Sequence, residues 1–149
     1  MAKRGTKADV SGGKELEAKF RQISREAKTE IEQALVKGAL RVERQAKINA
    51  PVNKQVGLGG RLRASITHRL TDGPNGPMAE VGTNVTYGKF QEYGTGQRGK
   101  GSGVPTPADY EYGSSKGIPA QPFLFPAYNQ NKDKILKDLA AAFKKGCGL

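Results

Sequence analysis

The sequence contains few side chains of the types that carry out catalysis. It has a single histidine, His68, and a single cysteine, Cys147, among 149 residues. A Ser-His-Asp triad would have to use His68, and no nucleophile motif accompanies it. The alternating pattern around His68 places it on the same side of a predicted strand as Leu62, Ile66 and Leu70. This favours a partly buried structural histidine, with a hydrolase that uses His68 as the alternative, and we expect no enzymatic activity.

Residues that could bind a metal ion or a phosphate group are equally sparse. One histidine, one cysteine and carboxylates placed beside lysines and arginines supply no ligand cluster, so we expect neither a metal nor a cofactor. Residues 94–101 satisfy the phosphate-loop pattern G-x-x-x-x-G-K, but Gly101 stands where a serine or threonine would hold magnesium. A flexible glycine loop explains this segment better. Cys147, beside two glycines, is expected to be an inert thiol.

The chain is strongly basic, with 25 Lys and Arg against 14 Asp and Glu, a net charge of +11. Lysine and arginine gain affinity for phosphate by releasing counterions, so the alternative function is a small basic nucleic-acid-binding protein without enzymatic activity. The excess is spread over every segment, tryptophan is absent, and the aromatic residues lie mostly away from the basic clusters. This distribution does not favour sequence-specific recognition of a nucleic acid.

The sequence predicts neither a membrane span nor a secretory signal. No stretch approaches about 18 consecutive apolar residues, and no apolar run follows the charges at the N-terminus. We therefore expect synthesis in the cytoplasm and no membrane partner.

The elements that must position these residues begin with a long helix. Apolar residues recur at steps of three, four and seven from residue 14 to about residue 50, where Pro51 ends the pattern. An unbroken helix of this length would reach about 50 Å. Gly38 is a candidate for a break or for a point of close packing, so one long helix and two shorter ones both remain open. Residues 1–13 lack periodicity and predict a flexible basic arm, which leaves residues 14–149 as a single α+β domain.

A hairpin is predicted after this helix. Residues 61–70 alternate as in a half-buried strand, residues 72–77 are rich in turn formers, and residues 78–83 form the returning strand. The connecting loop is thus expected to have about six residues. The apolar residues of 85–93 follow partly the spacing of a strand and partly that of a helix. This segment therefore predicts the end of a strand followed by a short helical turn.

The last third of the chain predicts a loop and a second helix. Residues 94–117 are rich in glycine, proline and serine and are expected to project as a loop, with a short strand at Tyr110 and Tyr112 as the alternative for that part. Residues 119–126 are the most apolar stretch, and residues 127–145 predict an amphipathic helix. The fold class is α+β: a long N-terminal helix, a small antiparallel sheet with a β-hairpin, and a C-terminal helix packed on the sheet.

Four short motifs occur in a fixed order along the chain. They are A-K-I-N-A-P-V at 46–52, G-R-L-R-A-S-I at 60–66, V-G-T-N-V-T-Y-G-K-F-Q-E-Y-G-T at 81–95 and P-A-Q-P-F-L-F-P-A at 119–127. In this order and spacing they resemble the head-tail joining and tail-completion proteins of tailed bacteriophages, the family that includes phage lambda's minor tail protein Z. The resemblance covers residues 15–145. The loops around 53–59 and 96–117 are longer than many members have.

The resemblance implies a structural protein of the virion neck. Its copies would form a ring, expected as a hexamer, that joins head to tail or completes or terminates the tail, with DNA passing through. The implied partners are copies of the chain, adjacent head-completion proteins, tail tube or terminator proteins, and genomic DNA by non-specific proximity. The implied location is the head-tail interface of the virion, and the host cytoplasm during assembly.

Three groups of residues are assigned on this basis. The predicted subunit interface comprises Phe20, Ile31, Leu35, Phe123, Leu124 and Phe125. The loops predicted to dock on neighbouring proteins carry Lys54, Val56, Leu58, Arg98 and Lys100. The basic residues predicted to lie near DNA are Lys3, Arg4 and Lys7.

Overall fold

A computed structural model of the chain describes residues 13–52 and 60–149, except for the side chains of residues 13–17 and 20. The predictions made for the N-terminal arm with Lys3, Arg4 and Lys7, for the Phe20 side chain, and for Lys54, Val56 and Leu58 lie outside the described residues. The elements are α1 (Gly13–Asn49), α2 (Arg61–Ser65), β1 (Ile66–Gly73), β2 (Gly76–Thr83), α3 (Gly88–Tyr93), α4 (Gly96–Gly99) and α5 (Leu124–Gly146).

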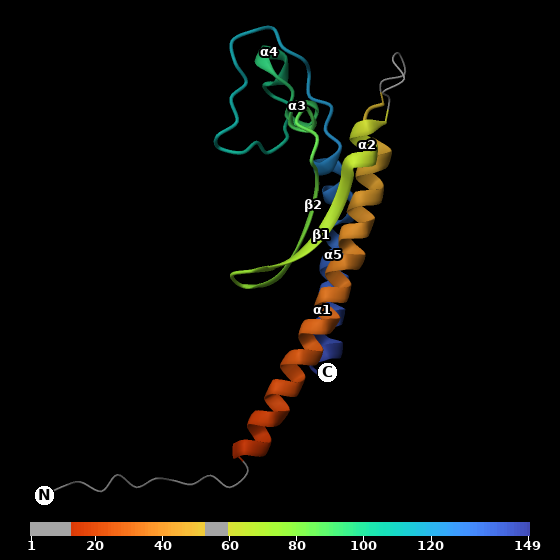
Figure 1. Cartoon of the computed structure of the whole chain (residues 1–149), viewed down its shortest axis with the longest axis vertical. Helices are drawn as coiled ribbons and strands as arrows, with labels where there is room; N and C mark the ends of the chain where they lie inside the picture. Colours follow the sequence, from red (N-terminus) through yellow and green to blue (C-terminus); the bar gives the residue numbers. More distant parts are fainter. Residues whose placement is uncertain (1–12, 53–59) are drawn as a thin grey trace, which may run out of the picture.

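The molecule is elongated, with α1 and α5 lying side by side along its length (Figure 1). The β1–β2 hairpin lies against one side of the helix pair, and α3 and α4 form a lobe near the C-terminal end of α1. The buried core consists mainly of aliphatic side chains with one phenylalanine: Val42, Ala46, Ala50, Leu62, Ile66, Phe123 and Ala127. Val81 of β2 and Ile135 of α5 both pack against this core, so the predicted α+β fold is confirmed.

α1 is one continuous helix of 37 residues that passes through Gly38. Gly38 is buried at the contact with α5, where an added Cβ would lie 3.1 Å from Cγ1 of Ile135. At the other end of α5, an added Cβ on Gly146 would lie 2.3 Å from Cα of Ala27. These two glycines let the antiparallel helices approach closely. Gly38 is therefore a packing position, and the two-helix alternative is wrong.

The strand predicted for residues 61–70 is wrong over its first half, where α2 forms instead. Gly60 adopts a positive φ of 104°, and its carbonyl accepts a hydrogen bond of 2.8 Å from the Ala64 N–H. Leu62 and Ile66 are both buried. Residues four apart share a face in a helix and also in a strand, so this pair does not distinguish the two structures.

The hairpin is confirmed, but its connection is shorter than expected. β1 and β2 pair antiparallel from Ile66↔Thr83 to Gly73↔Gly76, which leaves a turn of Pro74 and Asn75 in place of a six-residue loop. On the face away from the helices, Arg69 and Glu80 are paired across the strands, with Nε 2.5 Å from Oε2.

The lobe is more ordered than a flexible glycine loop. The N–H groups of Thr95 and Gln97 donate to the carbonyls of Ile118 and Ser115, each at 2.9 Å. An added Cβ on Gly117 would lie 1.9 Å from the Thr95 carbonyl oxygen, so glycine is required there by close backbone approach. The expectation of an unstructured segment is wrong for this part, although residues 100–112 do form the projecting loop in Figure 1.

Two further details of the lobe differ from the sequence prediction. The helical turn expected within 85–93 is present as α3, but the preceding strand ends at Thr83. Tyr110 and Tyr112 lie outside any strand. Tyr110 instead makes edge-on ring contacts with Tyr93 and Tyr112, at centroid distances of 4.9 and 5.1 Å. Within the described residues, no helix is long and apolar enough to cross a membrane.

Candidate functional site

An apolar groove lies between α1, α5 and β2. Its volume is about 510 Å³, and its walls include Leu35 and Val42 of α1, Val81 of β2, and Leu136 and Leu139 of α5. Most residues of these walls are hydrophobic, and the charged or polar lining residues include Glu92 and Tyr93 of α3 and Lys132 of α5. The site is therefore suited to binding another apolar surface.

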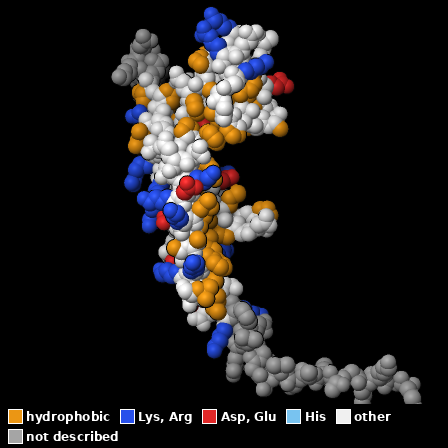
Figure 2. Space-filling model, turned by 180° about the vertical axis from the view of Figure 1, so that it is seen from behind, with side chains coloured by type: hydrophobic (Ala, Val, Ile, Leu, Met, Phe, Trp, Pro, Cys, Tyr) orange, Lys and Arg blue, Asp and Glu red, His pale blue; other side chains and the backbone are white. Residues whose placement is uncertain are grey.

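The α5 side of the groove exposes large hydrophobic side chains. Tyr128 is 49% exposed and Leu136 is 57% exposed. Figure 2 shows a band of hydrophobic side chains that runs down the helix pair. A contiguous exposed apolar surface of this kind is typical of a protein interaction site.

The structure brings three of the predicted interface residues together. Leu35, Leu124 and Phe125 all line the groove. Ile31 is half-buried one turn before Leu35 in α1. Phe123 has no exposed surface and belongs to the core of the subunit, where it is unavailable to a partner. The role of the other residues in a subunit interface stays a prediction.

Glu92 fixes the α5 wall of this groove. It is only 3% exposed, and its carboxylate accepts hydrogen bonds from the N–H groups of Phe123 at 2.8 Å, Leu124 at 2.9 Å and Phe125 at 2.8 Å. The next residue, Pro126, has no N–H to satisfy. A negative charge at this helix end is also stabilised by the helix dipole. One side chain from α3 therefore holds the start of α5.

This capping interaction was missed by sequence reasoning, and it explains why α5 begins at Leu124, three residues earlier than predicted. Residues 121–123 are Gln, Pro and Phe, so the sequence offers no serine, threonine, aspartate or asparagine as a local N-cap residue. The one available signal was Pro126, a residue that is tolerated in the first turn of a helix. Burial raises the pKa of the neighbouring Tyr93, and the nearby charge of Glu92 raises it further.

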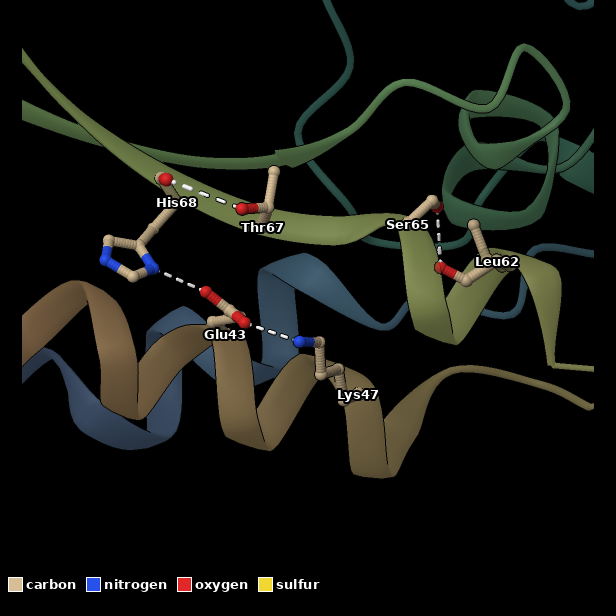
Figure 3. A network of polar contacts seen from close by, with 6 residues as sticks. All are labelled: Glu43, Lys47, Leu62, Ser65, Thr67 and His68. Carbon is tan, nitrogen blue, oxygen red and sulfur yellow. Dashed lines mark hydrogen bonds and ion pairs between the residues drawn. The ribbon is translucent and has the colours of Figure 1, made fainter.

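A second polar contact holds the hairpin against α1. Oε2 of Glu43 lies 2.5 Å from Nδ1 of His68, and its Oε1 lies 2.5 Å from Nζ of Lys47 (Figure 3). Hydrogen bonds from Lys47 and His68 lower the pKa of Glu43. His68 is half-buried in this contact, which agrees with the structural role predicted for it. Ser65 donates to the Leu62 carbonyl at 2.7 Å and closes α2 just before the strand.

Replacement of Glu43 by glutamine is expected to lower the free energy of unfolding by about 1 kcal/mol at neutral pH. The folded-state pKa of Glu43 lies below its ordinary value of 4.5. The stabilisation is therefore complete above the unfolded-state pKa and is lost as the pH falls through the folded-state pKa. Urea unfolding of both proteins between about pH 7 and about pH 3 should show the difference shrinking at the acid end. A difference that stays constant with pH would contradict this assignment.

The predicted docking residues in the lobe lie on the surface. Arg98, in α4, and Lys100, which follows it, are both exposed. Within the described residues, no group of three or more His, Cys, Asp and Glu side chains gathers as a metal site would require. The candidate site is thus the apolar groove, whose α5 wall is held by Glu92, beside the hairpin that Glu43 holds against α1.

Comparison with known proteins is informative for the first part of the chain. A family model described as "Bacteriophage HK97-gp10, putative tail-component" matches residues 14–94. The matched region runs from α1 through α3 and includes both Glu43 and Glu92. Neither the comparison with curated proteins nor the comparison with solved structures gave a match.

Proposed function

Because the chain belongs to the HK97-gp10-like family of bacteriophage tail components, we propose that it is a non-enzymatic structural protein of the virion neck. Its copies form a ring that joins head to tail or completes or terminates the tail, with DNA passing through the ring. It acts at the head-tail interface of the virion and is present in the host cytoplasm during assembly.

The observation that carries the proposal is the exposed apolar groove. Leu35, Leu124 and Phe125 line it, and Tyr128 and Leu136 leave about half of their surfaces uncovered. In a ring, such a surface is covered by a different surface of the next copy, since head-to-tail contacts close into cyclic assemblies. We propose that six copies associate in this way.

The N-terminal part of α1 supplies a candidate surface for the neighbouring copy. α5 ends beside Ala27, where Gly146 packs, so α1 continues past the helix pair. Residues 21–26 are exposed, and Ile23 is 38% exposed. A helix of this kind gains little stability from its sequence alone and is usually stabilised by packing an apolar face against a partner.

Two segments that the sequence predicts to be loops are proposed to contact the adjacent layers of the virion. Arg98 and Lys100 in the lobe, and Lys54, Val56 and Leu58 in the 53–59 loop, are the proposed contacts to head-completion and tail tube or terminator proteins. Lys3, Arg4 and Lys7 are proposed to lie near genomic DNA. No membrane partner is proposed.

Leu136→Asp is expected to weaken self-association about a hundredfold, which is close to 3 kcal/mol. The substitution places a charge without a partner in an apolar contact, which is costly to bury. The matched control is Leu40→Asp, because Leu40 is 43% exposed on α1 and lies outside the groove. Native mass spectrometry and negative-stain electron microscopy over a concentration series measure the assembly of both variants.

Circular dichroism and thermal unfolding establish that both variants fold. Rings formed equally well by wild type and Leu136→Asp would exclude the groove as the interface. A wild-type protein that stays monomeric at every concentration and is absent from purified virions would contradict the neck proposal as a whole.

A further inference from the structure

A strip of basic side chains follows the line along which α1 and α5 meet, on a different surface from the groove. We call it the basic seam; it consists of Lys37, Arg41 and Arg44 of α1 with Lys134 and Lys145 of α5. We propose that the basic seam binds the phosphate backbone of double-stranded DNA.

The seam carries more cations than its carboxylates neutralise. Arg41 forms an ion pair with Asp138, and the charges of Lys37 and Lys134 also act on that carboxylate. At the other end, Nζ of Lys145 lies 2.9 Å from Oε1 of Glu30. Among the described residues, the five cations of the seam are therefore balanced by only two paired carboxylates, Asp138 and Glu30.

The excess cations are accessible to a ligand. Lys37, Arg44 and Lys134 are all exposed, and Lys37 and Arg44 lie two turns apart on the same face of α1. Figure 2 shows lysine and arginine side chains along one edge of the helix pair, beside the hydrophobic band, with fewer acidic side chains among them. The antiparallel packing of α1 and α5 thus turns scattered basic residues into one surface.

The shape and composition of the seam favour DNA over a protein partner. A trough of about 290 Å³ at the Lys145 end of the seam is lined by Lys37 and Lys145 with the carboxylates Glu30 and Asp138, and by Gln33, Ala34, Ala141 and Ala142, without a large apolar side chain. Centres of protein interfaces are depleted of lysine and enriched in aromatic residues, whereas DNA interfaces are polar and strongly positive. Because Lys145 pairs with Glu30, the seam extends along α1 from the level of Glu30 to Arg44, a length of about 21 Å. A duplex carries about one negative charge per 1.7 Å over that length.

The seam and the groove have no lining residue in common. One copy can therefore cover its groove with a neighbour while its seam remains open to DNA. This inference extends the proposed function, in which DNA passes close to the protein, by giving that contact a defined surface. It does not require the ring, because every seam residue comes from one copy.

The test is the salt dependence of binding to a duplex of about 30 base pairs, a length that covers the seam more than once. Fluorescence anisotropy is measured over a salt series for wild type and for Lys37→Gln/Arg44→Gln/Lys134→Gln. The matched control, Arg61→Gln/Lys89→Gln/Lys116→Gln, removes the same number of charges from exposed positions outside the seam. The seam variant is expected to reduce the slope of log K against log salt by about 2 to 3. Its affinity at moderate salt should fall at least tenfold, and the control should stay within about threefold of wild type.

Four results would overturn the proposal. These are the absence of DNA binding by wild type, an unchanged slope in the seam variant, equal losses in the seam and control variants, and equally tight seam-dependent binding of poly-glutamate. The last result would assign the seam to an acidic protein. Leu136→Asp separates this proposal from the proposed function, since it should assemble poorly and still bind DNA with the wild-type slope.

Discussion

Glu92→Ala is expected to lower the free energy of unfolding by about 3 to 5 kcal/mol, which would be among the largest effects of any single substitution in this protein. The carboxylate accepts three backbone hydrogen bonds at the start of α5 and is 3% exposed. Alanine leaves these N–H groups without their acceptor at a largely buried helix start. Urea unfolding followed by circular dichroism measures the loss.

Two further variants test whether this loss of stability comes from the missing hydrogen-bond acceptor. Glu92→Gln should lose an intermediate amount, because the amide keeps one oxygen acceptor but points an N–H donor toward backbone donors. Glu80→Gln is the surface control; Glu80 is 41% exposed and pairs with Arg69 on the outer face of the hairpin, so its loss should stay below about 1 kcal/mol. Equal losses in the free energy of unfolding for Glu92→Ala and Glu80→Gln would show that the Glu92 cap stabilises the fold no more than a surface ion pair does.

The second large effect is expected from Phe123→Ala, at about 3 to 5 kcal/mol. Phe123 has no exposed surface and packs among Val42, Ala46 and Ile66 in the core. Removing its ring deletes buried apolar contacts and leaves a cavity that the neighbouring helices can fill only in part. Thermal and urea unfolding both report this loss.

Phe125→Ala is the matched comparison, because Phe125 is half-buried and lines the groove. It should destabilise the subunit less than Phe123→Ala and should impair assembly at concentrations where the variant is fully folded. Near wild-type stability of Phe123→Ala would contradict its placement in the core. Unchanged assembly of Phe125→Ala, together with unchanged assembly of Leu136→Asp, would remove the groove from the interface.

The sequence pattern predicted the long helices well because their apolar stripes are local and extend over many turns. Ala27, Ala34, Val42 and Ala46 all lie on the buried side of α1. The pattern was weaker over short elements. Leu62 and Ile66 fit a helix and a strand equally, and residues 72–77 look like one long loop although the strand pairing extends to Gly73 and Gly76. Short segments contain too few periods for the spacing to decide.

The candidate site depended on contacts between residues far apart in the chain. Phe123, Leu124 and Phe125 form one apolar run in the sequence, yet only the tertiary structure separates the core residue from the two that line the groove. Likewise Gly96 and Gly117 suggest flexibility by composition, whereas the fold uses them where two backbone segments pass within contact distance.

The sequence by itself determined the two long helices, the hairpin, the basic character of the chain and its resemblance to phage neck proteins, because all of these depend on local spacing and composition. The tertiary structure alone decided that Glu92 caps α5 from 31 residues away. It also decided that the groove gathers apolar side chains from three elements and that the basic seam joins cations from both ends of the chain. The physical reason is that burial and charge clustering depend on which surfaces meet, and that is settled only when α1 and α5 pack together.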